Sequence, residues 1–141
     1  MDDIRSLAGK TYNEAFEAVE AGDNPVWAVE LAAASLNLWR RVGTAQNLSI
    51  GCWLYSRALA KAGAGQLALD VAKNCLHHLE NVEDPADWLT ASALEGWARA
   101  LMAANDERFE HALQEAKRAI AAIADPQARD LIQGQLADIA G

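Results

Sequence analysis

The sequence has few of the residues that define disulfide-linked, metal-bound or strand-rich domains. Its 141 residues include two cysteines, three prolines and 6% aromatic residues. Cys52 and Cys75 lack the short spacing of a zinc site, and both fall in segments with helical periodicity. Val, Ile and Thr are sparse and never alternate along a run, so no strand is predicted.

Positive charge and long apolar runs are also scarce. The net charge is −8, whereas nucleic acids and anionic membrane surfaces require clustered Lys and Arg, so we exclude both as partners. No apolar run approaches the roughly 20 residues of a membrane span. The acidic start, Met1 to Arg5, lacks the apolar region of a signal peptide. We therefore expect a soluble, cytoplasmic protein that its acidity keeps dispersed.

Alanine and helical periodicity dominate the chain. Each proline follows Asn or Asp, as Asn24-Pro25, Asp84-Pro85 and Asp125-Pro126, and a capping side chain before proline indicates a helix start. Gly22, Gly43 and Gly63 indicate helix ends. The sequence thus predicts a single all-α domain over residues 1–141, in which short connections make successive helices antiparallel. Its seven helices are expected at 2–21, 25–41, 45–62, 66–80, 85–103, 106–123 and 126–140.

An internal repeat links the fourth and sixth predicted helices. Apolar positions match at an offset of 44 residues, and the same offset carries Trp53 to Trp97. The matched residues are Ala68, Leu69, Ala72, Leu76 and Leu79 with Ala112, Leu113, Ala116, Ile120 and Ile123. A period of this length that holds two helices indicates a helical solenoid.

The repeat resembles the tetratricopeptide family. Ala28, Ala68 and Ala112 resemble its small residue near the start of each second helix, and Gly63 resembles its turn glycine. The period exceeds the usual repeat of about 34 residues, the Leu-Gly pair of the first helix is absent and the closing proline is late. The resemblance implies a right-handed α-solenoid of antiparallel pairs, capped by the helix at 126–140, whose first helices line a concave groove.

Residue patterns for catalysis, cofactors or metals are absent. His77, His78 and His111 lie on polar helix faces, as do carboxylate pairs such as Glu14 and Glu17, whereas acid–base chemistry requires such groups in a desolvated pocket. The sequence also lacks a phosphate loop and a nucleophile elbow. We therefore predict no catalytic, cofactor-binding or metal site, and no enzyme.

Trp53, Arg57 and Lys61 are the candidate partner-binding residues. Their four-residue spacing places them on one helix face beside the apolar stripe. We expect them to project into the groove as a cationic, aromatic patch that suits an acidic or carboxylate-ended peptide. The alternative is a Trp53 partly buried against the first helix, with both cations in solvent.

These observations favour a non-enzymatic protein–protein interaction module that binds a peptide or helix in a concave groove. Two alternatives remain open. One is a small helical enzyme or ligand-binding subunit with a pocket between helices, and the other is a self-associating structural homodimer.

Overall fold

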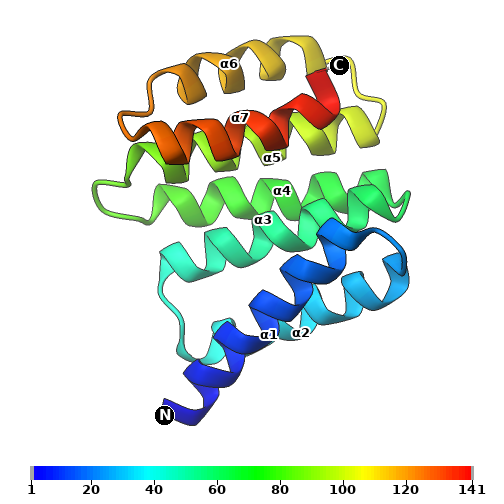
Figure 1. Cartoon of the computed structure of the whole chain (residues 1–141), viewed down its shortest axis with the longest axis vertical. Coiled ribbons are helices and arrows are strands. Elements are labelled where there is room, and N and C mark those ends of the chain that lie inside the picture. Colours follow the sequence, from blue (N-terminus) through cyan, green and yellow to red (C-terminus); the bar gives the residue numbers. More distant parts are fainter. Residues whose placement is uncertain (1, 141) are drawn as a thin grey trace.

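The computed structural model describes residues 2–140, which form seven helices and no strand (Figure 1). The all-α prediction is confirmed, and five of the seven predicted helices lie within one residue of the observed bounds. The helices are α1 (Asp2–Ala21), α2 (Pro25–Val42), α3 (Ala45–Lys61), α4 (Gly65–Glu80), α5 (Asp87–Ala103), α6 (Phe109–Ala121) and α7 (Pro126–Ala140).

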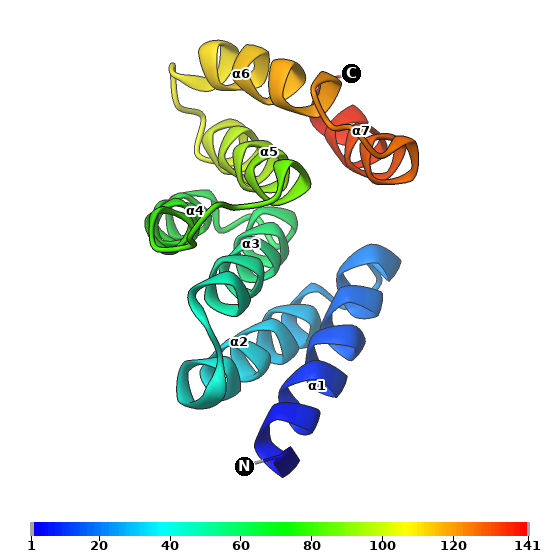
Figure 2. The ribbon, with the colours of Figure 1, turned by 90° about the vertical axis from the view of Figure 1, so that its left-hand side faces the viewer.

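Successive helices pack as antiparallel pairs, which stack along the length of the molecule. The pairs are α1 with α2, α3 with α4 and α5 with α6, and α7 packs on α5 and α6. Figure 2 shows that α1, α3, α5 and α7 lie toward one side of the stack, while α2, α4 and α6 lie toward the other. Ala28, Ala68 and Ala112 are buried near the starts of the second helices, because small side chains let paired helices approach closely.

The core consists of three apolar clusters between helix layers. Leu69 of α4 and Leu113 of α6 are 3% and 6% exposed, so the 44-residue repeat correctly predicts equivalent buried positions. Leu69 packs with Leu59 of α3, and Leu113 packs with Ala91 of α5. Each thus faces the helix that precedes it, as the repeat requires.

Two of the three Asx-Pro pairs begin helices as predicted. Asn24 Oδ1 accepts a hydrogen bond from the Trp27 amide at 3.1 Å, and Asp125 Oδ2 accepts one from the Ala128 amide at 3.0 Å. The prediction is wrong for Asp84-Pro85, because α5 begins at Asp87. Asp84 has a φ of 52°, and this left-handed conformation differs from the extended backbone that an N-cap residue takes.

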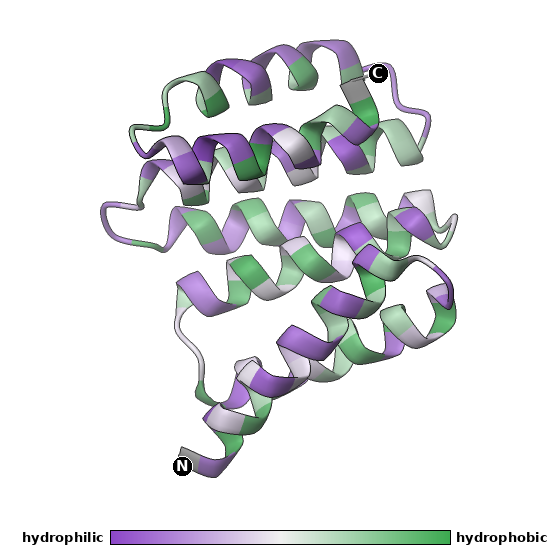
Figure 3. Ribbon diagram, viewed as in Figure 1, coloured by the Kyte–Doolittle hydropathy of each residue, from purple (hydrophilic) through white to green (hydrophobic). Residues whose placement is uncertain are grey.

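Each helix carries both hydrophobic and hydrophilic residues along its length, as Figure 3 shows. This pattern buries one face of a helix and leaves the other polar. Among residues 2–140, none of the helices combines the length and the apolar character needed to span a lipid bilayer.

Candidate functional site: a groove between α1 and α7

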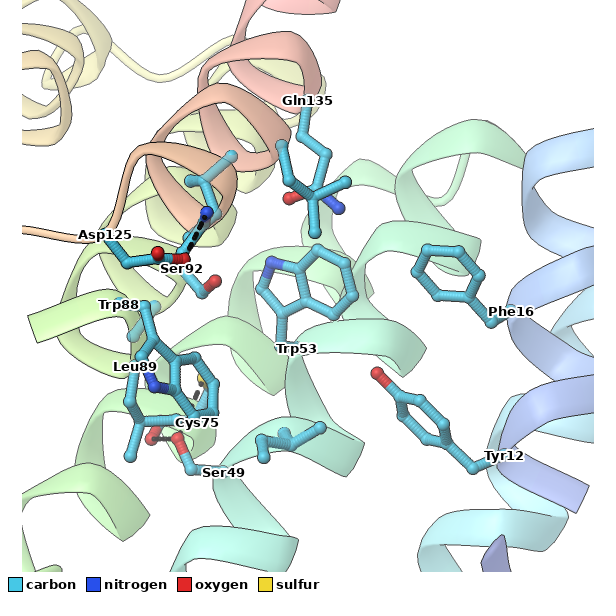
Figure 4. Close-up of a pocket in the computed structure, with 15 residues that line it drawn as sticks. Tyr12, Phe16, Ser49, Trp53, Cys75, Trp88, Leu89, Ser92, Asp125 and Gln135 are labelled. Atoms are coloured by element: carbon cyan, nitrogen blue, oxygen red, sulfur yellow. Dashed lines mark hydrogen bonds between the residues drawn. The ribbon is translucent and has the colours of Figure 1, made fainter. Parts of the chain in front are cut away.

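A cavity of about 520 Å³ lies on the side of the stack lined by α1, α3, α5 and α7. Trp53 of α3 lies between two walls (Figure 4). Tyr12 and Phe16 of α1 line one wall, and Leu131 and Gln135 of α7 line the other. Most of the 15 lining residues are apolar. We call this space the aromatic cavity.

Three rings form a continuous aromatic surface along the cavity. Tyr12 and Phe16 are four residues apart, so they share one face of α1, and their ring centroids are 6.5 Å apart. Phe16 stacks on Trp53 with centroids 6.3 Å apart. Burial raises the pKa of Tyr12 to about 12, so its phenol remains protonated at neutral pH. The surface is therefore uncharged.

Trp53 is held in one orientation by α5. Its Nε1 donates a hydrogen bond to Glu95 Oε1 at 2.9 Å. Gly96 leaves space for the ring, since a Cβ atom at that position would lie 2.7 Å from Trp53 Cδ1. The indole is 7% exposed. A rigid aromatic side chain of this kind loses little conformational entropy when a ligand packs against it.

Glu95, Arg57 and Arg99 form a buried charged cluster next to Trp53. Arg99 Nε donates to Glu95 Oε2 at 3.0 Å, and Arg57 Nη1 lies 3.7 Å from the same oxygen. Glu95 is fully buried and Arg57 is 2% exposed. Burial lowers the pKa of Arg99, and the Glu95 carboxylate offsets part of that change. Because buried charges are costly unless paired, the three side chains depend on one another.

The cluster also connects the two walls of the groove. Arg57 Nε donates to Glu20 Oε1 of α1 at 3.1 Å, and Arg57 Nη2 donates to Asp138 Oδ2 of α7 at 3.3 Å. Arg99 Nη2 donates to the Gln135 carbonyl at 2.7 Å. Charged side chains therefore link all four helices that line the groove.

The predicted trio of Trp53, Arg57 and Lys61 is divided among three places. Trp53 lines the aromatic cavity, and Arg57 lines a neighbouring depression. Lys61 is exposed beside the turn between α1 and α2, where its Nζ donates to the Val19 carbonyl at 3.2 Å. The expected cationic patch is not formed, because carboxylates from α1, α5 and α7 surround Arg57.

Sequence reasoning missed the residues of both walls. Along α1, a four-residue spacing separates Tyr12, Phe16 and Glu20. This spacing is the sequence feature that indicates the α1 wall. No local pattern marks Leu131 or Gln135 as their counterparts, because α7 meets this groove only through the tertiary fold.

Thiols and imidazoles show no sign of reactivity in the described part of the chain. Burial raises the pKa of Cys52 to about 11 and that of Cys75 to about 12, so both are protonated at neutral pH. His77 Nδ1 lies 3.9 Å from Glu80 Oε2 in an exposed pair. Within residues 2–140, no group of three or more His, Cys, Asp or Glu side chains is arranged to hold a metal ion.

A stack of antiparallel helix pairs with a groove on one side defines a helical-repeat protein. The chain has a tetratricopeptide-like fold: it is similar to the solved structure of a TPR-like protein from Chlorobium tepidum TLS, with a TM-score of 0.73. The similarity covers 99% of this chain and 98% of that one at 15% sequence identity, which confirms the predicted fold. No family model and no curated protein matches the sequence.

Proposed function

We propose that this protein is a non-enzymatic interaction module that binds a peptide or helix of another protein in the groove between α1 and α7. The observation that carries the proposal is the aromatic cavity on the side of the stack formed by the first helices of the pairs. Helical grooves of this kind bind amphipathic segments through apolar anchors. The fold alone does not specify this function, so the proposal depends on the cavity.

The three predicted residues take different roles in this proposal. Trp53 contacts the ligand directly, since it lies between the two walls and is fixed by Glu95. Arg57 is a positioning residue whose guanidinium carbon lies 5.7 Å from the centroid of the Trp53 ring. Lys61 contacts only a partner that extends past the C-terminal end of α3.

The state of the carboxylates at the aromatic cavity supports binding rather than catalysis in that cavity. Asp125 is the one carboxylate among the residues that the structure places around the aromatic cavity, and it accepts a hydrogen bond from the Ala128 amide as a helix cap. Glu95 is fully buried and engaged with Trp53 and Arg99. A general acid or base must reach the substrate proton, and neither carboxylate is free to do so.

A small apolar molecule is the second candidate ligand. The cavity volume of about 520 Å³ falls within the range of roughly 300–1,000 Å³ that small-molecule sites occupy. Such a ligand would fill the aromatic cavity alone, whereas a peptide or helix would also contact the exposed rim.

A random-peptide library displayed on phage tests the proposal, with two leucine variants as a matched pair. Leu131 lines the groove and is 62% exposed, whereas Leu67 lies outside it on α4 and is 53% exposed. Arginine is therefore tolerated structurally at either position. We expect selected peptides to bind wild type and Leu67→Arg equally, and Leu131→Arg at least about tenfold more weakly, which corresponds to about 1.4 kcal/mol.

Two results would contradict the proposal: no peptide enriched above background, or peptides that bind Leu131→Arg as well as wild type. Sedimentation equilibrium of the same proteins addresses self-association. A dimer that Leu131→Arg dissociates would assign the groove to a second copy of this chain.

A further inference from the structure

An acidic compartment continues from one end of the aromatic cavity. Its volume is about 400 Å³, and it shares Phe16, Leu131 and Gln135 with the cavity. The side chains that distinguish it are charged: Glu20, Arg57, Asp130 and Asp138. The groove therefore combines an apolar and an acidic compartment.

The two compartments overlap along the helix axes. On α1 the lining residues run from Tyr12 through Phe16 to Glu20, and on α7 they run from Ala128 to Asp138. On α1, Glu20 follows the aromatic residues toward the C-terminal end, whereas on α7 Asp130 precedes Leu131 and Asp138 lies eight residues after Asp130. Eight residues of helix separate Tyr12 from Glu20, which is a rise of roughly 12 Å.

Negative charge exceeds positive charge in the acidic compartment. The guanidiniums of Arg57 and Arg99 pair with three carboxylates, those of Glu20, Glu95 and Asp138, and Asp130 adds a fourth carboxylate to the lining. The guanidiniums are buried, whereas the Glu20 and Asp138 side chains are 40% and 53% exposed. Asp130 is exposed and forms no ion pair or hydrogen bond with the described residues. A ligand in this compartment therefore meets carboxylate oxygens.

We propose that the segment bound in the groove presents apolar side chains together with a flanking Lys or Arg, which pairs with Asp130. The apolar side chains lie against Phe16 and Trp53, and the cation lies beside Leu131, next to Asp130. This inference rests on the proposed function. It assigns the ligand a positive charge, whereas Arg57 and Lys61 in the sequence indicate an acidic ligand.

Electrostatics disfavour the other occupants. An acidic segment would bring like charge against Asp130 and Asp138 in a partly enclosed trough, which is unfavourable. A second copy of this chain carries a net charge of −8 and would add long-range repulsion to the same contact. A cationic partner instead gains long-range attraction.

Asp130 provides the test, because its substitution breaks no ion pair or hydrogen bond with the described residues. The variants are Asp130→Asn and Asp130→Lys, and the matched controls are Asp70→Asn and Asp70→Lys on α4, where Asp70 is also exposed and lies outside the groove. The probe is the tightest-binding peptide from the phage selection, compared with a version in which glutamine replaces its Lys or Arg.

We expect the glutamine peptide to bind wild type about twofold to fivefold more weakly than its parent, as loss of partly exposed ion pairs implies. Asp130→Asn should weaken the parent peptide about threefold and Asp130→Lys more strongly, whereas the Asp70 variants should match wild type. Raising the ionic strength should reduce the difference between the two peptides.

The outcomes separate this inference from the function on which it rests. Selected peptides without a cation, or equal affinities of both peptides for every Asp130 variant, would overturn the cationic ligand. The proposed function would stand in that case if Leu131→Arg still weakens binding. Binding that is insensitive to Leu131→Arg would overturn both. Enrichment of acidic peptides would contradict the inference directly.

Discussion

At the scale of single residues, Glu95 is the residue of the groove on which its neighbours depend most. It accepts a hydrogen bond from Trp53 and pairs with Arg99 and Arg57, all in the interior. Removal of its carboxylate leaves two buried guanidiniums without their shared partner. We predict that Glu95→Ala lowers the free energy of unfolding by about 3–5 kcal/mol, measured by urea denaturation.

Glu80→Ala is the control for this substitution. Its side chain is 77% exposed, so the change in stability should stay within about 0.5 kcal/mol. A loss below about 1 kcal/mol for Glu95→Ala would show that the guanidiniums find other partners, and that the cluster does not hold Trp53.

Cys75 makes stability depend on alkaline pH. Burial raises its pKa from 9.0 to about 12, so above pH 9 the unfolded thiol ionises while the folded thiol stays protonated. The folded state then binds more protons, and the free energy of unfolding falls as pH rises, by at most about 1.4 kcal/mol per pH unit for this group. We predict a shallower decline between pH 9 and 11 for Cys75→Ala than for wild type. Parallel pH profiles from urea denaturation would contradict the raised pKa.

The sequence predicted the helix face of Trp53 and Arg57 but not the environment of that face. Four-residue spacing is a local property, and it correctly places the two side chains together. The groups that neutralise Arg57 lie far away in sequence: Glu20 is 37 residues before it and Asp138 is 81 residues after it. Periodicity carries no information on such contacts. The sequence therefore predicts that Arg57 is a free cation, although in the structure it is buried and paired.

At the scale of helices, local chemistry predicted most boundaries. Asn24 and Asp125 cap α2 and α7 through their own side chains, and such short-range signals are readable in a sequence. The starts of α5 and α6 were missed because Asp84 and Asn105 take left-handed conformations with φ of 52° and 56°. Asp and Asn take this conformation more often than other non-glycine residues, but they also cap helices, so the sequence does not distinguish the two roles.

The repeat predicts that Leu69 and Leu113 contribute similarly to stability. Both are almost fully buried between a second helix and the first helix that precedes it. Leu69→Ala and Leu113→Ala should each lower the free energy of unfolding by about 2–5 kcal/mol, because each leaves a cavity in the core. The exposed Leu67→Ala should change it by less than about 0.5 kcal/mol. Losses below about 1 kcal/mol at both buried positions would make the 44-residue match coincidental.

At the scale of the whole molecule, the groove is a product of the stack rather than of any single repeat. Among the described residues α1 and α7 do not pack on each other, and they are joined through Arg57, which pairs with Glu20 and Asp138. Figure 2 shows the two helices on the same side of the stack, at its two ends. Helical periodicity predicted the stack, but the wall contributed by α7 required the three-dimensional structure.

The indole N–H signals in a ¹H–¹⁵N NMR spectrum test the groove most directly. Among the five tryptophans, Trp53 and Trp88 line the aromatic cavity, whereas Trp27, Trp39 and Trp97 lie outside it. On titration with a selected peptide we predict that the signals of Trp53 and Trp88 shift while the other three stay in place, with Trp53→Phe used to assign its signal. Shifts confined to Trp27, Trp39 or Trp97 would contradict the account and move the binding surface away from the groove.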